Sequence, residues 1–204
     1  MNYYSIAPFI KEYYPQYYTI ETYPFDQCAT IRKVREEWGI LGNFAPTPLE
    51  VDGVRFRTSE QLFQLMKFTD AEALKAVYLA NNPKMTAKHW EKTHRREDWG
   101  KTIVDAMKYC LMQKYEQNES FRTELARSNG LYIVEDQTSF PKKTPDTWGV
   151  KRHESVFVGP NLLGRLLMEL RNNGRLSYQL PDDSLDFIQT LKKEVPIHGT
   201  TTLF

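Results

Sequence analysis

The stretch Thr58-Ser-Glu-Gln-Leu-Phe-Gln-Leu-Met-Lys-Phe68 carries a helix start signal, and the expected fold is built outward from it. Thr58 is followed three residues later by Gln61, the spacing of a capping box, so a helix is predicted to begin here. On this helix Glu60, Gln64 and Lys67 recur at i, i+4 and i+7 and share one face. The opposite face is apolar and can be buried; its residues are Leu62, Leu65 and Met66.

This row of polar side chains has two interpretations. A carboxylate, an amide and an amine in one line suit acid–base and nucleophilic chemistry. The alternative is a solvated face, in which the positive helix N-terminus favours Glu60 and water surrounds Lys67. Spacing alone favours the solvated face, because charged rows are common on helices.

A chain of 204 residues with 41% hydrophobic and 13% aromatic residues can bury one core, which predicts a single folded domain. Its net charge of +1 gives no bulk electrostatic reason for non-specific nucleic-acid binding, and leaves room for a local basic patch. The N-terminus lacks the pattern of a signal peptide, and no apolar run reaches membrane-spanning length. Cys28 and Cys110 lack ligand spacing and are interpreted as reduced thiols, so we expect a soluble cytoplasmic protein without a membrane partner.

Periodicity and turn signals predict the remaining elements. Asp52-Gly53, between alternating apolar residues of 49–56, predicts a β-hairpin that leads into the capped helix. The other elements are helices near 71–81, 84–91, 98–117, 120–127, 162–171 and 183–194, strands at 131–134 and 155–158, and a strand or short helix at 30–38. The expected fold class is α+β, a mainly helical single domain with a few short β-strands.

The ends of the chain differ from its middle. Residues 1–30 carry paired tyrosines and are interpreted as an extension packed on the domain, because such rings more often half-bury at a domain edge than stack on bases. Residues 31–195 form the predicted domain, and the Thr-rich residues 196–204 form a flexible tail.

Two carboxylates lie where loops leave the predicted scaffold. Glu135 directly follows the buried strand 131–134, and Asp146 opens the stretch Asp146-Thr-Trp-Gly149 at the end of the next loop. Loops held by a rigid scaffold are where sites tend to form, although Asp146 alternatively forms an Asx turn. Trp99, in the first turn of helix 98–117, is either a packing anchor or the wall of a pocket.

The helix near 162–171 has two further signals. Asn161 is its expected N-cap, and the N–H groups at that end are placed to hold a phosphate. Gly164 inside the helix costs about 1 kcal/mol against alanine, which predicts that another part of the chain packs very close to it. His89 and His94 do not have HExxH spacing, so no metal site is expected.

Spaced motifs between residues 38 and 172 resemble, in order, those of one known family. They are Gly42-Asn43-Phe44, Val51-Asp-Gly53, Glu60 with Phe63-Gln64 and Lys67-Phe68, Asp98-Trp99, Met107, Leu111, Lys114, Val134-Glu135, Asp146-x-Trp148-Gly149, and Asn161-Leu-Leu-Gly164 with Leu167-Met168 and Arg171. The family is the NADAR/YbiA-like family. The resemblance implies a YbiA-like fold and an N-glycosidase that acts on a ribose C1′–N bond without a metal or cofactor.

The resemblance also implies roles for these residues. The lysine that matches Lys67 looks like a nucleophile that captures the ring-opened sugar as a Schiff base, which requires a neutral amine. Breaking a C1′–N bond needs an anion near the sugar and a proton donor near the base, for which Glu60, Glu135 and Asp146 are the candidates. In the competing mechanism a carboxylate activates water and Lys67 only orients Glu60. The expected binding residues are Asn43, Phe44, Gln64, Trp99, Trp148, Gly149, Asn161 and Gly164.

Several functions remain open at this point. The favoured substrate is ADP-ribose linked to guanine in DNA or RNA, with the chain acting as the partner of an ADP-ribosyltransferase toxin. The alternative substrate is a phosphoribosylamino-pyrimidine intermediate of riboflavin biosynthesis. From other classes, the chain is a non-catalytic ADP-ribose-binding module, or an interaction domain whose partner docks on the tyrosine-rich segment.

Overall fold

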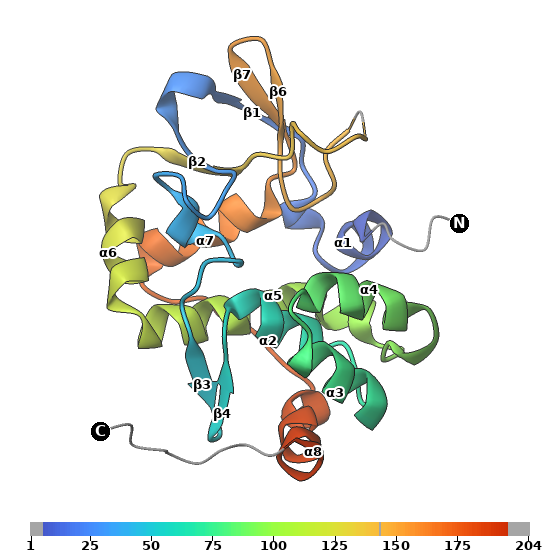
Figure 1. Ribbon diagram of the computed structural model, residues 1–204. Coiled ribbons are helices and arrows are strands. Elements are labelled where there is room, and N and C mark those ends of the chain that lie inside the picture. Colours follow the sequence, from blue (N-terminus) through green and yellow to red (C-terminus); the bar gives the residue numbers. More distant parts are fainter. Residues whose placement is uncertain (1–5, 143, 196–204) are drawn as a thin grey trace.

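The computed structural model describes residues 6–142 and 144–195, which fold into helices joined to short strands (Figure 1). The α-helices are α1 (Ala7–Tyr13), α2 (Ser59–Leu65), α3 (Ala71–Leu79), α4 (Pro83–His94), α5 (Trp99–Gln117), α6 (Glu119–Arg127), α7 (Leu162–Asn173) and α8 (Phe187–Glu194). The strands are β1 (Glu21–Pro24), β2 (Cys28–Ile31), β3 (Leu49–Val51), β4 (Val54–Phe56), β5 (Tyr132–Glu135), β6 (Lys151–His153) and β7 (Val156–Gly159). The predicted α+β fold, mainly helical with short strands, is confirmed.

The helix predicted at Thr58 is α2, and its start is capped as expected. The Thr58 side chain accepts a hydrogen bond from the Gln61 N–H at 3.1 Å. The Gln61 side chain in turn accepts one from the Arg57 N–H at 2.8 Å, one residue further from the helix than a standard capping box. Because both donors would otherwise lack partners, the two bonds fix where α2 begins.

The long helix α5 forms the centre of the helical part, with α1, α2 and α6 packed against it (Figure 1). Five apolar residues recur at helical spacing along this helix and are expected to face the core. Ile103, Met107, Cys110 and Leu111 are buried, and Tyr115 is only partly buried against the same core. The helix α8 covers α3 and the end of β4. Within the two described ranges, no helix combines the length and the apolar composition that crossing a bilayer requires.

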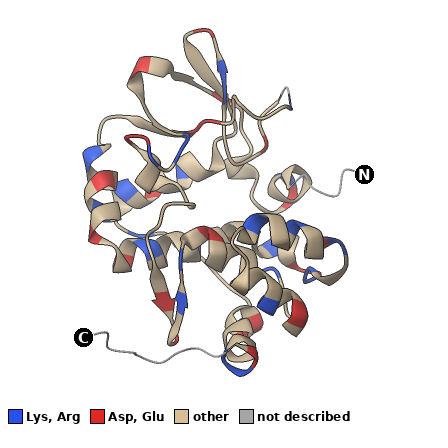
Figure 2. Ribbon diagram, viewed as in Figure 1, with Lys and Arg blue, Asp and Glu red and all other residues tan. Residues whose placement is uncertain are grey.

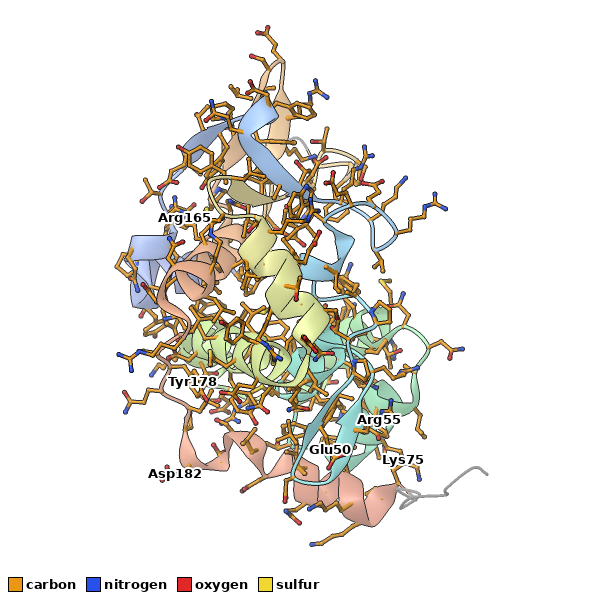
Figure 3. The ribbon with its side chains drawn as sticks, turned by 90° about the vertical axis from the view of Figure 1, so that its left-hand side faces the viewer. Glu50, Arg55, Lys75, Arg165, Tyr178 and Asp182 are labelled. Carbon is orange, nitrogen blue, oxygen red and sulfur yellow. The ribbon has the colours of Figure 1, made fainter. Side chains whose placement is uncertain are left out.

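The strands form three small sheets. The hairpin β3–β4 is confirmed, and Asp52 and Gly53 at its turn have φ values of 47° and 73°, as a type I′ turn requires. Glu50 and Arg55 face each other across this hairpin (Figure 3). The strands β2 and β5 pair in parallel, and β7 is the central strand of an antiparallel sheet in the order β1-β7-β6. The helix α7 packs against β5.

Two strands, one helix and one loop differ from the predictions; the helix is α1 (Ala7–Tyr13), in a segment where no helix was expected. The strands β1 and β6 were not expected; both are short edge strands that pair only with β7, and neither has an apolar alternation in its sequence that would predict it. The segment 30–38 is the end of β2 followed by turns, rather than one strand or helix. Its charged side chains remain on the surface, where turns place them.

The N-terminal segment packs against the helices. Tyr14 and Tyr17 are buried, and the hydroxyl of Tyr17 donates to Glu169 of α7 at 2.8 Å. Arg165 of α7 forms an ion pair with Glu21 at 2.7 Å and bonds the carbonyl of Thr19 (Figure 3). Tyr14 and Tyr17 therefore take part in packing this segment on the helices, whereas Tyr13 is 38% exposed. The pair Tyr3-Tyr4 and the tail 196–204 lie outside the described residues.

Candidate active site

A cavity of about 250 Å³ lies between α2, α4 and α5 on one side and the loops after β5 on the other. Nine of the residues predicted for the site line it: Asn43, Phe44, Glu60, Gln64, Lys67, Trp99, Glu135, Asp146 and Trp148. Gly149, Asn161 and Gly164 are not part of the lining. The fold therefore brings together most of the predicted side chains from segments far apart in the sequence.

Lys67, in the tight turn that follows α2, is only 9% exposed. Its Nζ forms an ion pair with Glu91 of α4 and lies 5.8 Å from the ring centroids of both Phe63 and Trp99. Burial lowers the pKa of Lys67, and the charges of Glu91 and Glu60 act against that effect. The solvated-face interpretation is wrong for this lysine, because α4 shields it from bulk water and it lines the cavity.

Glu60 and Gln64 are buried beside Lys67, and Gln64 Nε2 donates to Glu60 Oε1 at 2.8 Å. The Glu60 N–H donates to the carbonyl of Asn43 at 3.0 Å, which ties α2 to the loop before β3. Within the described residues, Gln64 Oε1 has no hydrogen-bond partner. A buried acceptor without a partner is costly, so this oxygen is suited to a donor on a bound ligand.

Glu135 and Asp146 face the cavity from the ends of one loop, and Gln137 joins them. Gln137 Nε2 donates to Asp146 Oδ1 at 2.7 Å and to Glu135 Oε2 at 3.3 Å. Burial first, and then the charge of Asp146, raise the pKa of Glu135 to about 7. Asp146 also accepts from the Trp148 N–H at 3.0 Å, so it forms the Asx turn and lines the cavity as well.

Aromatic rings form much of the remaining wall. Phe63 lies between Trp99 and Trp148, with ring-centroid distances of 5.2 and 5.7 Å. Phe44 at the mouth of the cavity is 46% exposed, and Lys84 Nζ lies 5.1 Å from its ring centroid. Rings in these positions can stack on a base or keep water out of the cavity.

Asn161 supports the site from behind and does not cap its own helix. Its Nδ2 donates to the carbonyl of Ile133 at 2.8 Å, and its Oδ1 accepts from the Glu135 N–H at 3.2 Å. A left-handed backbone, with φ of 53°, turns the side chain toward β5 and away from the helix. The N–H groups of Leu162 and Leu163 donate to backbone carbonyls, so these two groups are not available to a phosphate at this helix start.

The close approach predicted at Gly164 is confirmed. A Cβ on this residue would lie 2.0 Å from the carbonyl oxygen of Ile133 in β5. A Cβ on Gly149 would similarly lie 2.4 Å from the carbonyl oxygen of Glu135. Both glycines therefore allow the backbone of their segments to pack directly against β5.

We expect Gly164→Ala to lower the free energy of unfolding by about 3 kcal/mol, because α7 must move away from β5. Urea unfolding followed by circular dichroism measures the change. Asn173→Ala, at the exposed end of the same helix, is the control and should change stability by less than about 0.5 kcal/mol. Equal stability of the two variants would contradict the tight packing.

Lys114 fixes the loop that carries Asn43 and Phe44. It is completely buried, and its Nζ donates to the carbonyls of Ile40 and Gly42, both at 2.8 Å. In the described part of the chain no carboxylate forms an ion pair with it. Burial therefore lowers the pKa of Lys114 to about 7.

The buried amine makes stability depend on pH. Between pH 7 and about 10 the unfolded state binds a proton at Lys114 that the folded state has released, so stability rises with pH there. We expect the unfolding free energy of wild type to rise by about 2 kcal/mol relative to that of Lys114→Met between pH 7 and pH 9. Urea unfolding at several pH values measures it. A constant difference would contradict a neutral buried amine.

Sequence reasoning missed five polar residues that line the cavity: Lys84, Lys88, Glu91, Arg95 and Gln137. The first three recur at i, i+4 and i+7 on one face of α4, and Arg95 directly follows the end of that helix. That spacing was a signal in the sequence. Gln137 had none, because only the folded loop brings it between two carboxylates.

The fold and the pocket define the class of protein, a small α+β domain with a buried lysine and several carboxylates in one polar cavity. A family model identifies it further, since the NADAR domain matches residues 30–175. The chain belongs to the NADAR domain family. The resemblance seen in the sequence motifs is thereby confirmed.

Individual relatives agree with this assignment. The chain is 30% identical over 148 residues to "N-glycosidase YbiA" of Escherichia coli (strain K12), covering 72% of this chain and 88% of that protein. It is 25% identical over 170 residues to "Riboflavin biosynthesis protein VVA0006" of Vibrio vulnificus, covering 77% of this chain and 41% of that protein. The NMR structure of the E. coli protein YbiA matches with a TM-score of 0.58 and 25% identity, over 87% of this chain and 92% of that chain.

Proposed function

We propose that the chain is an N-glycosidase that hydrolyses the C1′–N bond of a ribosyl substrate. The observation that carries the proposal is a desolvated lysine, Lys67, in one cavity with the carboxylates Glu60, Glu91 and Glu135. The name of the relative YbiA, an N-glycosidase, supports the same reaction.

Lys67 acts as the nucleophile. Its ammonium gives a proton to the paired carboxylate of Glu91, which leaves a neutral amine. The amine attacks C1′ and forms a C–N bond, while the bond from C1′ to the base nitrogen breaks. The sugar ring then opens, its ring oxygen takes up a proton, and an imine joins Lys67 to C1′. Water hydrolyses the imine, which releases the sugar and restores the amine.

The carboxylates have different roles in this mechanism. Glu135, whose pKa is raised to about 7, gives a proton to the leaving nitrogen as that atom takes the electron pair of the broken bond. Glu60 lies on the lysine side of the cavity, where an anion stabilises positive charge on C1′. Asp146 holds Gln137 and the turn at Trp148 in place.

The competing mechanism needs no covalent intermediate. A water molecule, activated by Glu60 or Asp146, attacks C1′ directly, and Lys67 only orients Glu60. Burial of Lys67 argues for the covalent route, because a lysine that only orients a carboxylate has no need of a lowered pKa.

The first substrate to test is ADP-ribose linked to guanine in nucleic acid. A cavity of about 250 Å³ is smaller than the roughly 300–1,000 Å³ of pockets that enclose drug-sized ligands. Such a cavity suits one ribosyl group, with the rest of a larger substrate outside. The exposed ring of Phe44 at the mouth offers a stacking surface for a base that enters from a polymer.

The second candidate substrate is a phosphoribosylamino-pyrimidine of riboflavin biosynthesis. The name of the Vibrio vulnificus relative favours it. The reaction and the roles of Lys67 and Glu135 are the same for both substrates, so the difference lies in what binds outside the ribose.

Mass spectrometry of products distinguishes these candidates. The purified chain is incubated with an ADP-ribosylated guanine oligonucleotide and, separately, with the ribosylamino-pyrimidine phosphate. Release of ADP-ribose with the unmodified oligonucleotide supports the first substrate, and release of the pyrimidine supports the second. Binding of ADP-ribose without cleavage of either compound would overturn the proposal in favour of a non-catalytic binding module.

A further inference from the structure

The N-terminal helix α1 contributes an apolar residue to the wall of the cavity. Its N-cap residue, Ile6, lines the cavity and is half-buried. The helix lies before residues 30–175, the part of the chain that matches the NADAR domain. A segment outside that domain therefore completes the cavity.

Contacts with α5 hold α1 beside the cavity. The ring of Phe9 lies against Gly100 of α5, where a Cβ would come within 2.2 Å of that ring. The hydroxyl of Tyr14, directly after α1, donates to a backbone carbonyl in the first turn of α5. That turn begins with Trp99, so α1 has a fixed position next to a residue of the cavity wall.

The lining of the cavity has a polar part and an apolar part. The apolar part consists mainly of Ile6, Phe63, Trp99, Ile103, Trp148 and Leu163. Residues 6–10 carry no charge, whereas α4, which also lines the cavity, has several lysines (blue in Figure 2). The hydroxyls of a sugar suit the polar part, and the flat faces of a base suit the apolar part.

Hydrogen bonds connect this apolar part to the proposed proton donor. Asp146 accepts from the Trp148 N–H and from Gln137, which also donates to Glu135. In the proposed mechanism Glu135 gives its proton to the leaving nitrogen, which belongs to the base. The base therefore lies on the Trp148 side of the cavity, along the apolar residues.

We infer that Ile6 contacts the leaving base and limits its size, so that α1 helps to select the leaving group. The inference deepens the proposed function and rests on it, since it names a residue that distinguishes substrates of the same reaction. An aliphatic side chain packs on a base through dispersion and the exclusion of water. It forms no hydrogen bond, so it distinguishes bases by size and shape and not by their donors and acceptors.

Isothermal titration calorimetry with guanosine and uridine, which carry a large and a small base on the same ribose, tests this contact. Ile6→Ala removes apolar surface and should weaken the binding of both nucleosides about 3- to 10-fold. Ile6→Trp adds bulk to the wall and should weaken guanosine about fivefold or more relative to uridine. Glu12→Gln, an exposed change on the same helix outside the cavity lining, is the control and should bind both as wild type does.

A purely structural role of Ile6 would lower stability without changing which base is preferred. Thermal unfolding followed by circular dichroism therefore accompanies the titrations. The inference would be overturned by an unchanged ratio of the two dissociation constants in Ile6→Trp, by wild-type binding in Ile6→Ala, or by no binding of either nucleoside at several millimolar.

Kinetics separates this inference from the proposed function. Binding that depends on Ile6, with no cleavage of any N-ribosyl compound, would overturn the N-glycosidase and leave the base contact standing. Cleavage with kcat/KM unchanged in both Ile6 variants would overturn the base contact and leave the N-glycosidase.

Discussion

Lys67→Ala is expected to lower kcat/KM by about 1,000-fold or more and to abolish a covalent adduct that cyanoborohydride traps on wild type. The amine forms the bond to C1′ in the proposed mechanism, and no second amine in the described cavity shares its burial. Lys84 and Lys88 also line the cavity but are exposed to solvent, so they lack the desolvation that favours a neutral amine. Loss of a nucleophile typically removes most of the rate enhancement. Intact-protein mass spectrometry detects the adduct, and peptide mapping assigns it to a residue.

Two controls separate the loss of the nucleophile from a general effect of removing a lysine or unfolding the chain. Lys92→Ala, outside the cavity, should retain both the adduct and the activity. Circular dichroism of Lys67→Ala checks that removing the partner of Glu91 has not unfolded the chain. An active Lys67→Ala variant, within about tenfold of wild type, would refute the covalent route and assign the chemistry to carboxylate-activated water.

Local signals explain which parts of the fold were predictable. The start of α2 depends on Thr58 and Gln61, three residues apart, and the hairpin turn depends on Asp52 and Gly53. A few neighbouring residues determine each of these two features, so the local sequence is sufficient to predict them. The edge strands β1 and β6 are different, because only pairing with β7, distant from β1 in the sequence, makes them strands.

The candidate site also has parts that the local sequence predicts and parts that depend on distant segments. Glu60 and Gln64 follow from the geometry of α2, and Lys67 lies in the turn directly after it. Whether this row is solvated or buried depends on α4, which the row itself does not encode. The pairing of Glu91 has no local signal in the sequence, because its partner Lys67 lies in a separate segment, the turn after α2. Asn161 was expected to cap a helix, as asparagine often does. Its left-handed backbone instead turns the side chain toward β5, which the sequence does not indicate.

The second large effect is expected at Glu135. Glu135→Gln should lower kcat about 100-fold or more, because an amide cannot give a proton to the leaving nitrogen. The wild-type rate should also fall as pH rises above about 7, since the pKa of Glu135 is about 7 and only its protonated form is active. In the glutamine variant this fall with pH should disappear. Initial rates from pH 5.5 to 9 measure both effects.

Asp146→Asn tests the cause of that pKa. Asparagine keeps an oxygen that can accept from Gln137 Nε2 and the Trp148 N–H, so the turn is preserved while the charge is removed. Because the charge of Asp146 helps to raise the pKa of Glu135, its removal should move the fall in rate to lower pH. The variant would then lose activity at pH 7 and keep more of it at pH 5.5. A fall at unchanged pH would mean that burial alone holds the proton on Glu135, and a fall that persists in Glu135→Gln would assign the acid to another group.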